Sequence, residues 1–483
     1  MNLRTLLENQ VLLSVTGSLE LSVDSIISDS RQASHGALFV AIRGGQEQDR
    51  HAFVADAVRG GATAALVEDG SVDAGTATKI VVADTRRALA CVASRFHGDP
   101  SRDLLCVGVT GTNGKSTTAT IIRQILSTSS GPSAYLGTLG FACGEQVEAV
   151  ANTTPEAEQL HALLARARQA GCRSMVMEVS SHGLSLERVY GIEFAAAVFT
   201  NLTRDHLDFH GSEEEYFAAK SLLFRHLLPT ASAVLNADDP RSKKLAELTK
   251  ARVWTYGACN ADVTLQDVRL APDRTYLKLA TPDGVFDCDS ALTGRFNSSN
   301  VVAAVTTGLA LGIGPDEIRR GLAAVQGIPG RFERIDEGQP FLVIVDYAHT
   351  PAGLETVLQA ARELTSGQLI CVFGCGGDRD TGKRPMMGRI AETLADRVYL
   401  TSDNPRNEQP HQIIDQIAAG MQAAEGVIAE PDRAAAIHAA LSSADAGDVV
   451  VIAGKGDEPY QILDAGCVVP FDDRVVARQA LRS

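Results

Sequence analysis

The sequence predicts a protein of the α/β class, built from three domains. First, its 483 residues exceed what one hydrophobic core usually organises. Second, short apolar runs typical of strands alternate with helix-length amphipathic segments along nearly the whole chain, as in domains with parallel sheets. Third, Pro and Gly interrupt this alternation at two places, as linkers do.

The two interruptions set the expected domain limits. The first, HGDPS at residues 97–101, precedes the apolar run Leu104–Val109, and the second, GIPG at residues 327–330, precedes the run Phe341–Val345. We therefore expect domains of ordinary size at residues 1–99, 100–329 and 330–483.

Composition narrows the classes of partner. A net charge of −15 without a basic run disfavours nucleic acid and anionic membranes, although a few Arg and Lys could still bind a small anion. The start MNLRTLLENQ lacks signal-peptide features, and no apolar run reaches the roughly 20 residues of a membrane helix. Nine cysteines without a Cys-x-x-Cys pair suit a reducing compartment. We expect a cytoplasmic monomer without membrane insertion.

The stretch CVGVTGTNGKSTT at residues 106–118 has the form of a phosphate-binding loop, with one departure. Val109 stands where the usual pattern has its first Gly. We interpret Leu104–Val109 as a buried strand ending at Val109, and Ser116–Leu126 as the helix after the loop. This strand–loop–helix context favours nucleotide binding over an ordinary glycine-rich turn.

Each loop residue has a chemical reason to be there. Gly111 and Gly114 let backbone N–H groups turn toward a phosphate at a helix N-terminus. Lys115 can reach the β- and γ-phosphates, and the Ser116 hydroxyl is placed to bind Mg²⁺.

Polar residues follow two later strand-like runs. Glu178 ends the run in MVMEVSSHG, and Asp205 and His206 follow the run in VFTNLTRDH. Ligands bind at the carboxyl ends of parallel strands. Mg²⁺ prefers oxygen ligands such as the carboxylate of Glu178, while a single His could complete a second site, so these residues are metal candidates. Each residue alone is more typical of a solvated loop or a surface histidine. Their placement after successive strands of a phosphate-loop domain makes a functional role about equally favoured.

Lys220 lies in the predicted helix EEEYFAAKSLLF at residues 213–224. Helical periodicity alone favours an exposed lysine that pairs with a nearby glutamate.

Taken together, the motifs resemble the ATP-dependent Mur ligases of peptidoglycan synthesis. The resemblance runs from about Ser28 to Gln461 and rests on eight ordered stretches: TGTNGKST, MEVSSHGL, NLTRDHLDFHG, AAKSLLF, GRFNSSN, GIPGRFE, VDYAHTP and GDRDTGKRPMMG. It implies an N-terminal UDP-substrate domain, a central phosphate-loop ATPase with a mostly parallel sheet and a Rossmann-like C-terminal domain. It also implies amide formation through an acyl phosphate.

The same resemblance implies residue roles. Mg²⁺ would occupy two sites, one at Ser116 and Glu178, the other near His206 and a carbamate on Lys220, which replaces our exposed-lysine interpretation. The expected catalytic residues are Lys115, Glu178, His206 and Lys220. The expected ATP contacts are Gly111, Thr112, Asn113, Gly114, Lys115, Ser116, Thr117, Asn300, Arg331 and Asp346.

The C-terminal part points to the incoming amino acid. Asp403-Asn404-Pro405-Arg406 follows a strand-like run at 398–401 and resembles the motif that recognises meso-diaminopimelate. A guanidinium at Arg406 can clamp the distal carboxylate that distinguishes this amino acid from lysine, although an arginine capping the turn is the alternative. The expected diaminopimelate contacts are Arg379, Asp403, Asn404, Pro405, Arg406, Gly454 and Glu458.

For the other substrate, UDP-N-acetylmuramoyl-L-alanyl-D-glutamate, the resemblance points to residues whose hydroxyl, amide and guanidinium groups suit phosphate oxygens and peptide. They are Ser28, Ser30, Asn152, Thr153, Thr154, Ser180 and Arg188. Leu186, the stretch Gly45-Gln46-Glu47 and Asp457, where the family more often has His, depart from the pattern.

Three alternatives stay open. A lysine-adding muramyl ligase conflicts with Arg406, and folylpolyglutamate synthase conflicts with the well-formed domain before the phosphate loop. A nucleotide-dependent switch of the GTPase kind would carry an Asn-Lys-x-Asp motif, which the chain lacks.

Overall fold

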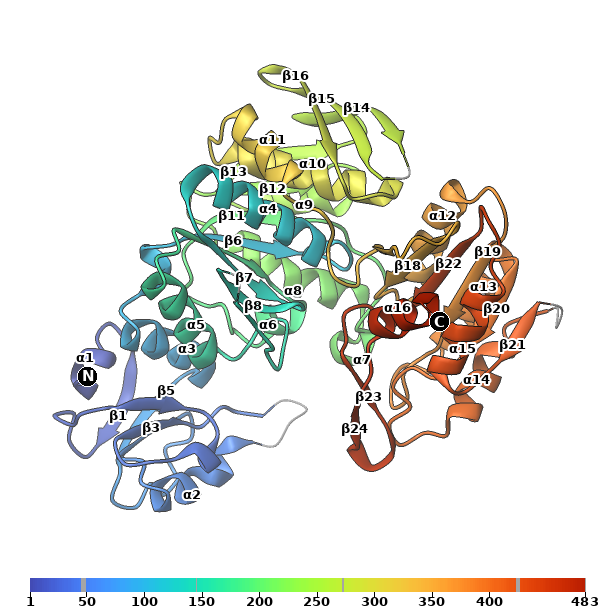
Figure 1. Ribbon diagram of the computed structural model, residues 1–483. Helices are drawn as coiled ribbons and strands as arrows, with labels where there is room; N and C mark the ends of the chain where they lie inside the picture. The colour runs from blue at the N-terminus through green and yellow to red at the C-terminus, as the bar shows by residue number, and fades with distance from the viewer. Residues whose placement is uncertain (45–48, 145, 272, 423–425, 483) are drawn as a thin grey trace.

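The computed structural model describes residues 1–44, 49–144, 146–271, 273–422 and 426–482. Three large sheets succeed one another along the chain and occupy three regions of the molecule (Figure 1), and a separate two-stranded sheet belongs to the C-terminal region. The departure at residues 45–47 lies outside the described residues. Within the described ranges, no helix combines the length and apolar character needed to cross a membrane.

The N-terminal sheet has the strand order β1-β5-β4-β3-β2. Only β1 runs antiparallel to its neighbour, and the other pairs are parallel. Its strands are β1 (Leu12–Thr16), β2 (Ser25–Ile27), β3 (Ala37–Val40), β4 (Ala64–Val67) and β5 (Thr78–Val82). Its helices are α1 (Leu3–Leu6), α2 (Val54–Arg59) and α3 (Thr85–Phe96), and α3 packs on the next region.

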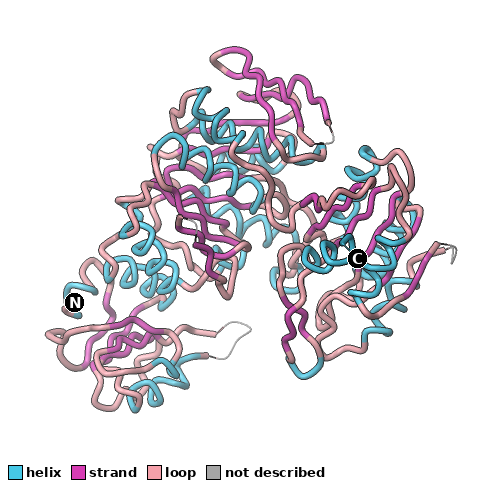
Figure 2. Tube along the Cα trace, in the orientation of Figure 1, coloured by secondary structure: helices cyan, strands magenta, loops and turns pink. Residues whose placement is uncertain are grey.

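The central sheet has eleven strands in the order β16-β15-β14-β13-β12-β11-β6-β10-β7-β8-β9. Seven of them, from β14 to β7 in this order, are parallel, and antiparallel hairpins extend both edges (Figure 2). The strands are β6 (Leu105–Thr110), β7 (Ser133–Gly137), β8 (Gly140–Cys143), β9 (Gln146–Glu148), β10 (Ser174–Glu178), β11 (Phe194–Phe199), β12 (Ser232–Asn236), β13 (Arg252–Gly257), β14 (Val263–Leu270), β15 (Thr275–Thr281) and β16 (Gly284–Ser290).

Helices cover both faces of this sheet and bury two apolar clusters against it. Because β6 lies between β10 and β11, the carboxyl ends of these three strands open at one edge, where α/β sheets bind ligands. The helices are α4 (Lys115–Ser130), α5 (Ala157–Gln169), α6 (Ser181–Ser185), α7 (Leu207–His210), α8 (Glu213–Arg225), α9 (Arg241–Leu248), α10 (Arg295–Ala310) and α11 (Pro315–Ala323).

The C-terminal sheet has the order β17-β18-β22-β19-β20-β21, parallel except for the β17–β18 pair. Its strands are β17 (Glu333–Ile335), β18 (Leu342–Asp346), β19 (Leu369–Phe373), β20 (Arg397–Leu400), β21 (Val427–Ala429) and β22 (Val449–Ala453), beside the hairpin β23 (Tyr460–Ile462) and β24 (Val468–Pro470). Its helices are α12 (Pro351–Leu364), α13 (Lys383–Leu394), α14 (Pro410–Ala418), α15 (Arg433–Ser442) and α16 (Asp473–Arg482).

The α/β class predicted from the alternating pattern is confirmed. The strand before the phosphate loop ends at Thr110, one residue later than predicted, because its pairing with β11 continues to Phe199. The helix after the loop begins at Lys115, one residue earlier than predicted. The three sheets fall within the three predicted domains, whose exact limits stay a prediction.

Candidate active site

The phosphate loop joins β6 to α4, as predicted. Gly114 has φ +83°, and a Cβ atom there would collide with the Asn300 side-chain oxygen. Asn300, on α10, is held by Thr118 (3.3 Å) and by its own bond to Asn297 (3.0 Å). Helices α4 and α10 are far apart in the sequence but pack together. Their packing brings two of the expected ATP contacts, Gly114 and Asn300, next to each other.

The rest of the loop is braced by the segment after β11. The Thr112 hydroxyl donates to the Thr203 carbonyl (3.2 Å), and the Asn113 N–H donates to the Asn201 side chain (3.0 Å). Two further expected ATP or metal contacts, Ser116 and Thr117, are buried in the first turn of α4.

Two lysines converge on one carbonyl of the loop. Lys115 Nζ donates to the carbonyl oxygens of Gly111 (3.1 Å) and Thr112 (2.8 Å), and Lys220 Nζ donates to the same Gly111 oxygen (2.8 Å). Helix α8, which carries Lys220, is started by Ser212 as N-cap and by three glutamates in its first turn. This helix thus brings a second amine to the loop.

Lys220 is buried, so the exposed-lysine interpretation drawn from periodicity is wrong. Its side chain is 1% exposed and lies over the Tyr216 ring at 4.6 Å. Burial lowers the pKa of Lys220 well below its usual value, and the neighbouring charge of Lys115 lowers it further. Removing an ammonium from water favours the neutral amine.

Glu178 ends β10, as predicted, and its carboxylate accepts three hydrogen bonds. It accepts from the Tyr135 hydroxyl, the Thr138 N–H (3.0 Å) and the Thr138 hydroxyl (3.3 Å). Burial raises the pKa of Tyr135 well above its usual value, and the Glu178 charge raises it further, so this hydroxyl stays a proton donor. Tyr135 and Thr138 were not among the residues expected from the sequence, because neither stands in one of the motifs.

Asp205 and His206 lie near this cluster. Their side chains approach to 3.4 Å, and His206 has a left-handed backbone with φ +51°. Burial lowers the pKa of His206 to about 4, against the opposing pull of Asp205. The ring of His206 also packs against His182 at 5.0 Å. A neutral imidazole of this kind can accept a metal ion or a proton.

Among the described residues, no three His, Cys, Asp or Glu side chains gather into a group that could hold a metal by themselves. Mg²⁺ is usually held by one or two protein oxygens together with substrate phosphates and water. The buried hydroxyl of Ser116 and carboxylate of Glu178 are oxygen donors of this kind and fit that pattern.

A chain of hydroxyl contacts continues from Glu178 to residues expected at the nucleotide-sugar substrate. Thr138 and Thr153 share a bond of 3.2 Å, Thr154 donates to the Glu178 carbonyl (3.0 Å), and the Ser180 N–H donates to Thr154 (3.0 Å). Three of the expected contacts therefore form one network beside Glu178.

The remaining expected contacts of that substrate are spread out. Arg188 is buried, donates to the Thr154 carbonyl (2.9 Å) and pairs with Glu156 (2.6 Å). Asn152 is exposed, whereas Ser28 is buried and bonded to Glu158 of α5, far from the Glu178 network in sequence. Ser30 begins a short 3₁₀ helix capped by Asp29.

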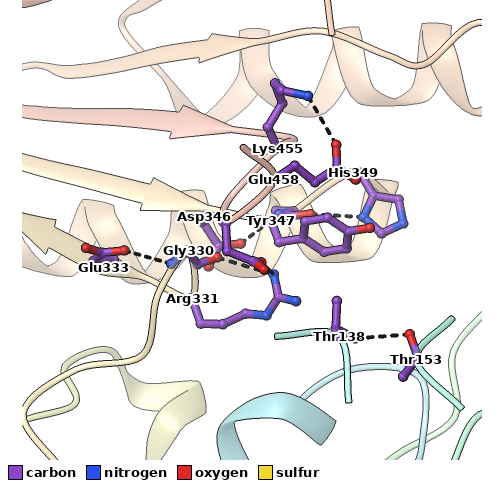
Figure 3. Close-up of polar contacts among 12 residues, drawn as sticks. Thr138, Thr153, Gly330, Arg331, Glu333, Asp346, Tyr347, His349, Lys455 and Glu458 are labelled. Carbon is purple, nitrogen blue, oxygen red and sulfur yellow. Dashed lines mark hydrogen bonds and ion pairs between the residues drawn. The ribbon is translucent and has the colours of Figure 1, made fainter. Parts of the chain in front are cut away.

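Two expected ATP contacts come from the C-terminal region (Figure 3). Asp346 ends β18, and its oxygens accept from the N–H groups of Phe332 (2.6 Å) and Ala348 (2.7 Å). Burial raises the pKa of Asp346 to about 6, although Arg331 lowers it. The Arg331 guanidinium lies over the Tyr347 ring at 4.3 Å and faces Thr138 of the central region.

The expected diaminopimelate residues gather at the carboxyl ends of β19, β20 and β22. Asp403 and Asn404 are buried after β20, and Arg406 has φ +51° and donates to the Gly377 carbonyl (2.8 Å). Gly454 has φ +119°, and a Cβ atom there would meet the Asp403 carboxylate. Arg379 is exposed on the loop after β19.

A buried lysine, missed from the sequence, organises this group. Lys455 is fully buried, and its Nζ donates to Asn404 (3.1 Å) and to Glu458 (3.1 Å). Asn404 also donates to Glu458 (2.9 Å). No motif in the sequence marked Lys455, and its burial follows only from the fold.

Residues 109–308 match the family described as the Mur ligase middle domain, and residues 330–456 match the family described as Mur ligase, glutamate ligase domain. Over 100% of this chain and 99% of the relative, the sequence is 43% identical to a UDP-N-acetylmuramoyl-L-alanyl-D-glutamate–2,6-diaminopimelate ligase from Syntrophomonas wolfei. The chain belongs to the Mur ligase family.

Two further Mur ligases support this assignment. A ligase of the same name from Synechococcus elongatus is 44% identical over 100% of this chain and 99% of its own. A solved structure of a ligase of that name superposes with a TM-score of 0.72, at 32% identity, covering 100% of this chain and 99% of the other. The resemblance drawn from the eight motifs is confirmed.

Proposed function

We propose that this Mur ligase joins meso-diaminopimelate to UDP-N-acetylmuramoyl-L-alanyl-D-glutamate at the expense of ATP. The full-length similarity to two ligases of that name supports the reaction. The structural observation that carries the proposal is that Lys115 and Lys220 both donate to the Gly111 carbonyl of the phosphate loop. The carboxylate of Glu178 ends the neighbouring strand β10.

The nucleotide side follows from this meeting. Lys115 now donates to loop carbonyls and can exchange them for the β- and γ-phosphates of ATP, while Gly114 and the N-terminus of α4 offer N–H groups. Asn300, Arg331 and Asp346 complete the ATP contacts from other elements.

The donor set suits two Mg²⁺ ions. Ser116 and Glu178 would hold one, and His206 with a carbamate on Lys220 would hold the second. A neutral, buried amine is the form that adds to CO₂, with one proton released, and burial favours that form of Lys220. When bound, the ions neutralise the negative charge that gathers as a carboxylate nears a triphosphate.

In the first chemical step, the side-chain carboxylate of the D-glutamyl residue attacks the γ-phosphorus of ATP, giving an acyl phosphate and ADP. In the second, an amine attacks the acyl carbon, phosphate leaves, and the amine loses a proton. Lys115 stabilises the charge on the transferred group. Thr153, Thr154, Ser180 and Arg188 would orient the acceptor next to Glu178, and Ser28, Ser30 and Asn152 would serve its remote end.

The amino acid would bind at the carboxyl edge of the C-terminal sheet. The Arg406 guanidinium donates from Nη1 to the Gly377 carbonyl. Its other N–H groups can bind the distal carboxylate of diaminopimelate. Glu458, held by Lys455 and Asn404, can receive the distal ammonium. Arg379, Asp403, Pro405 and Gly454 line the same edge. Lysine, which lacks the distal carboxylate, would gain nothing from Arg406.

The test measures phosphate release from ATP with the UDP-dipeptide and either meso-diaminopimelate or L-lysine, and identifies the product by mass. UDP-N-acetylmuramoyl-L-alanine, which lacks the reacting carboxylate, is the matched control. We expect release with diaminopimelate alone. Release with lysine would retain the ligase and refute the role of Arg406, and release with neither amino acid would refute the proposal.

We further propose that the enzyme is a cytoplasmic monomer with domain limits at residues 99/100 and 329/330. Sedimentation at micromolar concentration tests whether the enzyme is a monomer, and limited proteolysis near residues 99/100 and 329/330 tests the domain limits.

A further inference from the structure

Asp457 is the residue of the Gly454–Glu458 loop that departs from the usual pattern, and the structure places it beside Arg331. Its Oδ1 lies 3.4 Å from Nη1 of Arg331, and the two side chains are only 15% and 14% exposed. The same oxygen is buried and has no hydrogen-bond partner among the described residues. The ion pair with Arg331 is thus the direct contact that compensates the burial of this oxygen.

Arg331 is otherwise held loosely for a buried cation. Its guanidinium lies over the Tyr347 ring and makes a long bond of 3.3 Å to the carbonyl of its own neighbour, Gly330. The attraction to an aromatic face holds the guanidinium near the ring but does not fix the direction of its individual N–H groups. A carboxylate at one edge would fix where the guanidinium points.

The backbone makes this placement rigid. A Cβ atom on Gly330 would collide with the backbone nitrogen of Asp457, and one on Gly456 would collide with Tyr347 and the Gly330 carbonyl. Both glycines have positive φ, +62° and +56°. The segment that carries Arg331 and the loop that carries Asp457 therefore pack backbone against backbone and move together.

The guanidinium also acts across the boundary between the central and C-terminal regions. Its charge contributes to lowering the pKa of Lys115, after burial, and the Glu178 carboxylate acts in turn on Arg331. Burial raises the pKa of Asp457, and Arg331 is the largest influence opposing that rise. In the structure, the Arg331 guanidinium also faces Thr138, whose N–H and hydroxyl donate to Glu178 (Figure 3).

We propose that Asp457 is a positioning residue that holds the Arg331 guanidinium toward the phosphate loop, and that it does not contact the amino acid. The proposal rests on the proposed function in taking Arg331 as an ATP contact. The next residue, Glu458, turns the other way and bonds Lys455 and Asn404. Two adjacent carboxylates of one loop thus serve the two sites separately.

The test compares wild type, Asp457→Asn and Arg331→Lys with the double variant, using calorimetric binding of a non-hydrolysable ATP analogue with Mg²⁺ and steady-state kinetics. Asparagine keeps the shape of Asp457 and removes its charge. We expect Asp457→Asn to raise the Kd for the analogue and the KM for ATP roughly tenfold and to leave the KM for diaminopimelate unchanged. In the Arg331→Lys background, the same change should alter the Kd by less than about twofold.

Asp464→Asn, an exposed carboxylate of the adjoining segment, is the control for loss of negative charge and should match wild type. Additive effects in the double variant, or a change confined to the KM for diaminopimelate, would overturn the proposal. Binding of the analogue is measured without turnover and therefore tests the role of Asp457 independently of the reaction. A wild type that binds the analogue but forms no amide would refute the proposed function, and the binding data would still test the role of Asp457. A wild type that fails to bind it would refute both.

Discussion

At the scale of single residues, the buried amine of Lys220 is the most informative feature. It donates to Gly111 of the phosphate loop from a helix about a hundred positions later in the chain. A lysine kept out of water without a carboxylate partner is costly to the fold. Its retention there is better explained by chemistry at the loop than by stability.

That reasoning predicts the behaviour of Lys220→Met. Methionine has a similar length and fills the site without an amine, so we expect ligase activity to be lost while the melting temperature is unchanged or higher. Calorimetric melting and phosphate release from the same preparation check this. Turnover near wild type would contradict the assignment of Lys220.

Arg406 gives a second prediction at this scale. Arg406→Ala removes the group that would clamp the distal carboxylate, and we expect the KM for diaminopimelate to rise at least about thirtyfold, in line with a lost charged contact, with little change for ATP. Equal losses for both substrates would mean that the bond to Gly377 is structural. Initial rates with each substrate varied in turn separate the two outcomes.

The places of residues in the fold were predictable where a motif fixes the local backbone, as at Gly114, Lys115 and Glu178. The burial of Lys220 and Lys455 was not, because burial depends on what packs against a segment. In α8, Tyr216, Phe217, Lys220 and Phe224 are all buried, so apolar spacing on one face did not show which side was exposed.

At the scale of elements, a buried ion pair joins the C-terminal helix α16 to helix α15, beside the carboxyl edge of the C-terminal sheet. Arg433 and Asp473 have fully buried side chains joined by bonds of 2.7 Å. Arg433 also donates to the carbonyls of Ser402 (3.3 Å) and Ala453 (3.0 Å), which directly precede Asp403 and Gly454, two of the residues proposed to bind diaminopimelate.

Asp473→Asn would remove the negative charge that pairs with the buried guanidinium of Arg433. We expect a loss of about 3–5 kcal/mol in the free energy of unfolding, the range for breaking a buried ion pair. Arg482→Gln, on the exposed end of the same helix, is the matched control and should leave unfolding nearly unchanged. Urea unfolding of both variants measures the difference, and equal stabilities would refute this role of the pair.

Both limits of the strand before the phosphate loop and the start of the helix after it were predicted to within one residue, because the apolar run and the glycines mark them. The helix ends at Ser130, later than the predicted Leu126, because its last turn, residues 127–130, contains no apolar residue to mark it. The hairpins β8–β9 and β15–β16, at the edges of the central sheet, were not anticipated. Buried and exposed residues alternate in β15 and β16, whereas β8 is mostly buried and β9 is exposed. The strand that each of them pairs with depends on its neighbour at the edge of the sheet, which the local pattern does not contain.

At the scale of the whole molecule, the site is assembled from parts that the sequence separates by hundreds of positions. Arg331 and Thr138 face one space only once the central and C-terminal regions are brought together (Figure 3). Linear motifs predicted most of the members. The contacts between them, such as Asp457 with Arg331, depend on how two sheets are placed.

The junction between the N-terminal and central regions carries a buried histidine. His161 lies on α5, which packs against α3, and neither ring nitrogen has a hydrogen-bond partner among the described residues. Its side chain is fully buried, and this burial lowers the pKa of His161 to about 4. The imidazole is therefore neutral in the folded protein at neutral pH.

This predicts an acid-sensitive junction. Because the folded pKa lies below the ordinary value of 6.5, the unfolded chain binds the proton more tightly, and stability falls as pH drops from 6.5 toward 4. We expect His161 to account for about 2 kcal/mol of the stability difference between pH 8 and pH 5. In His161→Leu, which keeps an apolar side chain there, that part of the difference should vanish. Urea unfolding at both pH values decides it: an unchanged difference in the variant would mean that the proton binds elsewhere, such as at His206 or His210, whose pKa values burial also lowers.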